Sequence, residues 1–182
     1  MSELPTPQVA ARLAEALLSP LGDRWAHTQA VAARARELAD AVPSDARELL
    51  EVAAWWHDLG YATGLVQTGM HQIDGARFLE DMGYPNRLVA LVAHHSAAKC
   101  EAHERGLVCE LGRWDREESA VADALWMADM TTGPRGESFE YSDRLNEITA
   151  RYNADSIVGR AMTAAQPLIR GAIDRTKDRV AG

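Results

Sequence analysis

The stretch Glu51–Tyr61, EVAAWWHDLGY, is a run of apolar residues that ends in a histidine beside an aspartate. His57 lies seven residues after Leu50 and so shares a helical face with Leu50 and Ala54. Burying a carboxylate as an unpaired ion would cost on the order of several kcal/mol or more. The stretch therefore predicts an amphipathic helix that brings a polar pair, His57 and Asp58, into the core, where another group must compensate it.

Helix signals continue along nearly the whole chain. Thr6 and Pro7 are typical of an N-cap followed by proline at the first helical position. We expect Asp23 to cap the next helix, and Asp45 with Glu48 to form a capping box for the helix that ends in WWHDL. The remaining predicted helices cover about His71–Met82, residues from Pro85 through RLVALVAHHSAAK, REESAVADALWMADM, SDRLNEITARY, and about Ser156 to the end, where Pro167 is expected to kink or restart the helix.

The other segments add no strand. Cys100–Trp114 has mixed polarity and no clear period, so we expect a connecting loop. Gly83-Tyr84-Pro85 predicts a helix stop followed by a helix start. No stretch alternates or is enriched in β-branched residues as strands are. The sequence predicts an all-α fold and a single domain over residues 1–182.

Composition excludes several classes of protein. The formal charge of -8 argues against a protein that sheathes nucleic acid, although it permits a phosphorylated small molecule beside a metal ion. No apolar run approaches the roughly 20 residues of a membrane span. The N-terminus MSELPTPQ lacks a basic region followed by an apolar stretch, so we expect no signal peptide. Cys100 and Cys109 form no disulfide framework, and a cytoplasmic location suits them.

Four of the six histidines fall on apolar helix faces. His95 follows Leu88, Leu91 and Val92 at i, i+3, i+4 and i+7, whereas His94 is rotated by about 100° from that stripe. Asp129 completes a similar stripe. The set of inward-facing polar residues is His27, His57, Asp58, His71, His95 and Asp129. His103 lies in a polar segment and is expected to be solvated. Neutral imidazoles and carboxylates are ordinary metal ligands, so a metal centre is the simplest agent that satisfies the set together.

In this order and context, the six residues resemble those of the HD superfamily of metal-dependent phosphohydrolases, with the closest similarity to its bacterial nucleotide-hydrolysing branch. The resemblance covers roughly residues 24–135, and the C-terminal helices are expected to pack onto this core. The family pattern is a histidine, an adjacent His-Asp pair and a distant aspartate, here His27, His57, Asp58 and Asp129. Many members add two histidines between them, which His71 and His95 match.

The resemblance implies a single-domain HD-type helical bundle with a metal site between the central helices. Asp58 would bridge two divalent ions, while His57 would bind one of them. Manganese, iron, cobalt, nickel and zinc all accept these ligands. The implied activity is hydrolysis of a nucleotide or other phosphorylated small molecule by a metal-activated water.

Cationic side chains near the ligands are candidates for binding the remaining phosphates. These are Lys99, one helical turn after His95, Arg135, in the loop after Asp129, and Arg24, three residues before His27. We interpret Trp55 and Trp56 as core packing. Two alternatives stay open: a mixed-valent di-iron oxygenase on the same scaffold, and a non-catalytic HD protein that binds a nucleotide. The sequence does not predict the oligomeric state.

Overall fold

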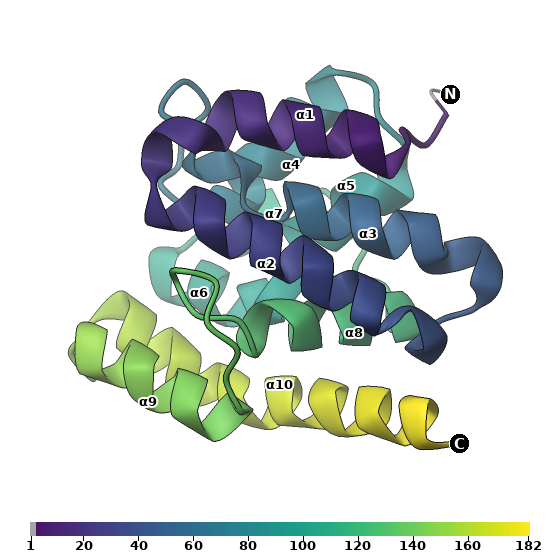
Figure 1. Cartoon of the computed structure of the whole chain (residues 1–182). Coiled ribbons are helices and arrows are strands. Elements are labelled where there is room, and N and C mark those ends of the chain that lie inside the picture. The colour runs from purple at the N-terminus through teal and green to yellow at the C-terminus, as the bar shows by residue number, and fades with distance from the viewer. Residues whose placement is uncertain (1–2) are drawn as a thin grey trace.

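The computed structural model describes residues 3–182, and this part of the chain forms an all-α single-domain fold (Figure 1). None of its helices is long and apolar enough to cross a bilayer. The α-helices are α1 (Pro7–Leu18), α2 (Asp23–Glu37), α3 (Arg47–Trp56), α4 (His71–Asp81), α5 (Asn86–Ala93), α6 (Ala98–Arg105), α7 (Val108–Leu111), α8 (Ala120–Met130), α9 (Tyr141–Arg151) and α10 (Ile157–Ala181). Short 3-10 helices are η1 (Ser19–Leu21), η2 (Ala39–Ala41), η3 (Ser44–Ala46), η4 (Leu59–Tyr61) and η5 (His95–Ala97).

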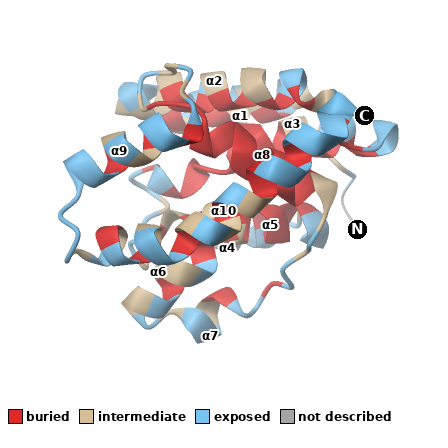
Figure 2. Cartoon of the chain, turned by 90° about the horizontal axis from the view of Figure 1, so that it is seen from below, coloured by how far each residue is buried: buried red, intermediate tan, exposed pale blue. Residues whose placement is uncertain are grey.

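Helix α8 lies at the centre of the bundle. It is apolar on nearly every face, and all of its residues from Val121 to Met130 are buried (Figure 2). Ser119 caps it by accepting a hydrogen bond from the Ala122 amide at 3.1 Å. Helices α2, α3 and α10 pack around α8. Asp129, at its C-terminal end, is therefore surrounded by protein on several sides.

The backbone of the turn after α3 packs directly against the backbone of α4. A Cβ atom on Gly60, in η4, would lie only 2.0 Å from the His71 carbonyl oxygen and 2.7 Å from the Gly75 nitrogen. Only glycine permits this approach. Gly60 and Gly75 thus set the position of His71, the first residue of α4, relative to the His57-Asp58 pair.

The predicted continuous helix after Pro85 is wrong, because it breaks at the two histidines. Helix α5 ends at Ala93, and the backbone then turns through left-handed conformations at Ser96 (φ 48°) and Ala97 (φ 58°) before α6 begins. Neither residue is glycine, so the sequence carries no ordinary signal for this turn. The loop predicted over Cys100–Trp114 is also wrong, since α6 and α7 occupy much of it.

The helix ends match the predictions in part. The Thr6 hydroxyl accepts from the Val9 amide at 3.4 Å, and Gly83 (φ 75°) closes α4, as expected. The caps expected from Asp23 and Asp45 do not form, because Asp23 lies inside α2 and neither α2 nor α3 has a side-chain cap. Helix α10 runs on through Pro167 rather than restarting there.

Candidate metal centre

The six predicted ligands come from five separate parts of the chain and meet in the interior. His27 lies on α2, His57 and Asp58 follow α3, His71 begins α4, His95 follows α5 and Asp129 lies on α8. They form two groups, within each of which the ligand atoms lie within 4.8 Å of one another: His27, His57 and Asp129, and Asp58, His71 and His95. The structure therefore brings all six together.

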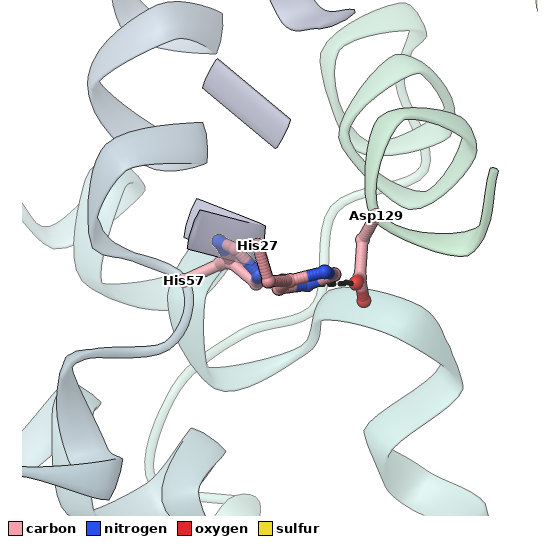
Figure 3. Close-up of side chains that lie close together, drawn as sticks. All are labelled: His27, His57 and Asp129. Atoms are coloured by element: carbon pink, nitrogen blue, oxygen red, sulfur yellow. Dashed lines mark hydrogen bonds and ion pairs between the residues drawn. The ribbon is translucent and has the colours of Figure 1, made fainter. Parts of the chain in front are cut away.

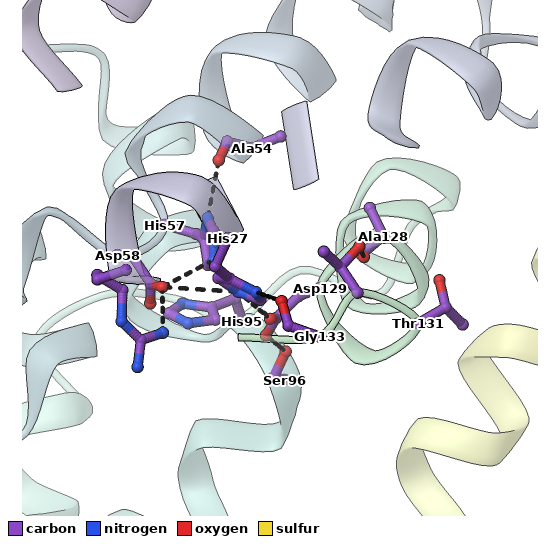
Figure 4. A network of polar contacts seen from close by, with 12 residues as sticks. His27, Ala54, His57, Asp58, His95, Ser96, Ala128, Asp129, Thr131 and Gly133 are labelled. Carbon is purple, nitrogen blue, oxygen red and sulfur yellow. Dashed lines mark hydrogen bonds and ion pairs between the residues drawn. The ribbon is translucent and has the colours of Figure 1, made fainter. Parts of the chain in front are cut away.

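The first group is shown in Figure 3. His27 Nε2 lies 3.0 Å from Asp129 Oδ1, and His57 Nε2 lies 3.8 Å from the same oxygen. The opposite ring nitrogens are held by the backbone: Nδ1–H of His27 donates to the Gly133 carbonyl at 2.9 Å, and Nδ1–H of His57 donates to the Ala54 carbonyl at 2.7 Å (Figure 4). A proton held on Nδ1 leaves the Nε2 lone pair free to face the centre, which is the usual arrangement of a metal-binding histidine.

The second group repeats this arrangement. His95 Nδ1–H donates to the Val92 carbonyl at 2.7 Å, and its Nε2 lies 3.2 Å from Nε2 of His71. Asp58 lies between the groups. Its Oδ2 is 3.3 Å from His57 Nε2, and its Oδ1 is 3.3 Å from His71 Nε2. One oxygen thus faces each group, as a bridging carboxylate requires.

One buried atom shows that the protein alone does not satisfy this centre. His57 is fully buried, and its Nε2 has no hydrogen-bond partner among the described residues, since its approach to Asp58 Oδ2 lacks hydrogen-bond geometry. An unsatisfied buried polar atom costs about 1–3 kcal/mol. A divalent cation between the imidazole nitrogens and the two carboxylates would satisfy it, so the donor set fits a metal.

The pKa values of the candidate ligands reflect burial and the charges that surround them. Burial disfavours the ionised form of Asp58, yet Arg24 and His57 hold the pKa of this carboxyl well below its usual range. Burial disfavours the charged form of His57 as well, but the Asp58 and Asp129 carboxylates outweigh it and raise the pKa of His57 to about 9. Burial lowers the pKa of both His71 and His95. Near neutral pH, the two carboxylates therefore lie close to the neutral imidazoles of His71 and His95 and to one proton on His57.

A cavity of about 300 Å³ opens onto the centre, and Arg24 and Tyr61 form one part of its lining. The Arg24 guanidinium donates to Asp58 Oδ2 at 2.6 Å and lies 4.0 Å above the Tyr61 ring. That ring stacks on His71 with centroids 4.1 Å apart. Burial and the nearby Asp58 carboxylate raise the pKa of Tyr61, so its hydroxyl keeps its proton. The stack fixes a positive charge and a hydroxyl beside the ligands.

The cavity is also lined by residues that the sequence did not predict for the site. Arg105 comes from α6, and Arg144 and Arg151 come from α9. Arg144, Ile148 and Arg151 are spaced i, i+4 and i+7, so the helical period could have shown their common face. Ser96, in the unpredicted turn, donates its hydroxyl to Asp129 Oδ2.

Lys99 and Arg135, the two cations expected near the substrate, do not line the cavity that opens onto the centre. Lys99 is exposed on α6 and does not line the cavity. Arg135 is 72% exposed and pairs with Glu137 at 3.0 Å. Both expectations counted residues along the chain from a ligand, but non-helical backbone at Ser96 separates Lys99 from His95, and Arg135 lies in the loop after α8.

The other two histidines and the tryptophans of EVAAWW lie outside the candidate centre. Nε2–H of His94 donates to the Trp114 carbonyl at 2.7 Å, away from both ligand groups, and His103 is exposed. Trp56 is fully buried and donates to the Ala10 carbonyl at 3.0 Å, while Trp55 stacks on Trp25. None of these side chains lines the cavity.

Comparison with known proteins agrees with this arrangement. The family model described as "HD domain" matches residues 24–132, which contain all six predicted ligands. The curated proteins and the solved structures gave no match. The matched range covers more than half of the chain and ends just after Asp129. The chain therefore belongs to the HD-domain family.

Proposed function

We propose that the protein is a metal-dependent phosphohydrolase that acts on a nucleotide or another phosphorylated small molecule. The observation that carries the proposal is the placement of Asp58 between two ligand groups, with one carboxylate oxygen facing each. The unpartnered Nε2 of His57 supports it, and so does membership of a family made up mostly of metal-dependent hydrolases.

Two divalent ions would fit the ligand set. His27, His57 and Asp129 would hold one, His71 and His95 the other, and Asp58 would contact both. Such a pair lowers the pKa of water and neutralises charge that develops on phosphoryl oxygens. The backbone carbonyls of Ala54, Val92 and Gly133 keep three of the imidazoles in the tautomer that can bind.

The chain's own residues would orient the phosphoryl group. Arg24 is partly exposed to the cavity, and its fork of donors matches phosphate oxygens. With a metal bound at Asp58, the Arg24 guanidinium would be free to donate to a phosphate oxygen of the substrate. Tyr61 keeps its proton, and its ring packs against the Arg24 guanidinium and holds it in place. Met130, Ile148 and Met162 give the cavity an apolar part that excludes water from the reacting phosphate.

The test begins with metal analysis of protein purified without added metal. Phosphate release is then screened with p-nitrophenyl phosphate and with nucleoside mono-, di- and triphosphates, using each of manganese, cobalt, nickel and zinc, and iron(II) under anaerobic conditions. We expect turnover with at least one metal in the wild type and none in Asp58→Asn. Asp123→Asn, which changes a buried carboxylate outside the cavity, should remain active.

A wild type that binds two metals but releases no phosphate above the Asp58→Asn background would contradict the proposal. Oxygen consumption that occurs only with iron would identify an oxygenase instead.

A further inference from the structure

The part of the cavity formed by α9 carries more positive charge than the protein neutralises. Arg144 and Arg151 both pair with the same carboxylate, Glu147, so one positive charge remains. Arg105 adds none, because it pairs with Glu101 at 2.7 Å. All three arginines line the cavity that opens onto the candidate metal centre.

Arg144 is the more unusual of the two α9 arginines. Its side chain is only 8% exposed, and its Nε has no hydrogen-bond partner among the described residues. A buried guanidinium normally has its donors paired, because desolvation of an incompletely compensated charge is costly. Arg151 lies two turns later on the same helical face and is more exposed. Both side chains line the same ligand-sized cavity.

Guanidinium groups bind phosphate and carboxylate through paired, charge-assisted hydrogen bonds. In the proposed function, the six-residue ligand set and Arg24 bind one phosphoryl group. An anion at Arg144 and Arg151 is therefore additional to it. Helix α9 also lies beyond the range matched by the family model, so this positive wall is a property of this chain's C-terminal segment.

We propose that Arg144 and Arg151 form a second anion-binding subsite, so that the substrate is a small phosphoester with a further phosphate or carboxylate group. This inference rests on the proposed function for the location of the first phosphoryl group. The cavity of about 300 Å³ holds both groups only in a small molecule. The apolar side chains Ile148, Val158 and Met162 line the space and would contact the part of the molecule that joins its two charged ends.

Binding of non-hydrolysable probes tests the subsite without any turnover. Dissociation constants of methylphosphonate, propylene bisphosphonate, pentylene bisphosphonate and a phosphonocarboxylate of matching length are measured by calorimetry on the manganese-loaded protein. We expect at least one two-headed probe to bind about tenfold or more tightly than methylphosphonate, from the additional charge-assisted hydrogen bonds. Tighter binding of the bisphosphonate than of the phosphonocarboxylate identifies the second group as phosphate, and the reverse order identifies it as carboxylate.

Three variants test whether the tighter binding of the two-headed probes depends on the α9 arginines: Arg144→Gln, Arg144→Lys and Arg151→Gln. Each should reduce the advantage of the two-headed probe to about twofold or less while leaving methylphosphonate binding unchanged. Arg160→Gln is the matched control, because Arg160 also pairs with a glutamate but lies outside the cavity. Circular dichroism confirms folding, and Arg151→Gln decides the test if the buried Arg144 variants unfold.

The inference is overturned if no two-headed probe exceeds methylphosphonate, or if its advantage survives in Arg151→Gln. Equal weakening of all probes would also overturn it, since that is a general electrostatic effect. Hydrolysis of p-nitrophenyl phosphate, which has no second anionic group, reports on the proposed function separately.

Discussion

Asp123 and the pair Asp58 and Asp129 are buried carboxylates in two regions of the molecule, and the protein surrounds them with different partners. Asp123, on α8, is 7% exposed and accepts hydrogen bonds from Arg175 at 2.5 and 2.9 Å and from Arg179 at 2.9 Å. Both arginines come from α10. Asp58 and Asp129 instead face a group of imidazoles, with Arg24 as the one arginine that pairs with either of them among the described residues.

The difference shows what marks a candidate site in this protein. The cavity beside Asp123 measures about 450 Å³ and exceeds the 300 Å³ cavity at the imidazoles. Volume alone would therefore select the wrong place. At Asp123 the protein supplies its own counter-charges, which attach α10 to α8. At Asp58 it supplies imidazole nitrogens, one of them without a hydrogen-bond partner among the described residues, and this donor set fits a metal ion.

The largest expected effect is a loss of metal binding when Asp58, but not Asp123, is replaced. Asp58→Asn should abolish tight metal binding, as should His57→Ala, because the first removes the bridge and the second removes a ligand. Asp123→Asn should keep full metal content but lower the free energy of unfolding by about 1–3 kcal/mol, less than for a deeply buried pair because both arginines are partly exposed. Elemental analysis and urea unfolding measure the two quantities. Full metal content in folded Asp58→Asn protein would refute the assignment.

The next effect separates two neighbouring histidines. His95→Ala should weaken binding of one metal by roughly a hundredfold or more, since loss of an outer partner of a ligand alone costs about 10–100-fold. His94→Ala should leave affinity unchanged, because its imidazole donates to the Trp114 carbonyl. Titration with manganese under anaerobic conditions measures both. Equal losses would mean that His94 also contacts the centre.

A smaller, selective effect concerns the second ligand group. Gly60→Ala would place a methyl group 2.0 Å from the His71 carbonyl, so α4 must move away and take His71 with it. We expect metal content to fall from two ions to one, as in His71→Ala, and stability to fall by about 1–3 kcal/mol. Gly64→Ala is the control, because its Cβ would meet no atom within 4 Å. A wild-type plateau at one ion, unchanged by either His71→Ala or Gly60→Ala, would defeat the dinuclear interpretation.

The smallest expected effect is a pH dependence of metal affinity. The pKa of His57 is raised to about 9, so this imidazole is protonated near pH 7 in the metal-free protein and must lose its proton to bind a cation. Apparent affinity should therefore rise with pH, by at most about tenfold per unit, until the pH reaches the pKa. Calorimetry in two buffers of different ionisation enthalpy measures the proton released. Affinity that stays flat above pH 7, with no proton released, would show that His57 is already neutral.

The sequence predicted the elements whose periodicity or end signals are local. The stripes that end in His57, His95 and Asp129 placed these residues in the core, and Gly83 closed α4 where expected. The HD-family membership followed from the same residues and is confirmed by the matched range. The metal ligands themselves stay a prediction, although the structure brings all six together.

The sequence did not predict features that depend on tertiary structure. The turn at Ser96 and Ala97 uses left-handed conformations without glycine, which no propensity predicts. Lys99 was counted forward from His95 across that turn, and it does not line the cavity. Arg144 and Arg151 lie beyond the resemblance, and only the packing of α9 near the cavity brings them to the centre.

The contact between His27 and Asp129 joins residues 102 positions apart in the chain. A cation shared by such distant ligands would act as a cross-link, closing a long loop much as a disulfide does and removing conformational entropy from the unfolded chain. Unfolding of the loaded protein would then require release of the ion. The lifetime of the native state in the presence of a chelator would report how quickly this cross-link opens.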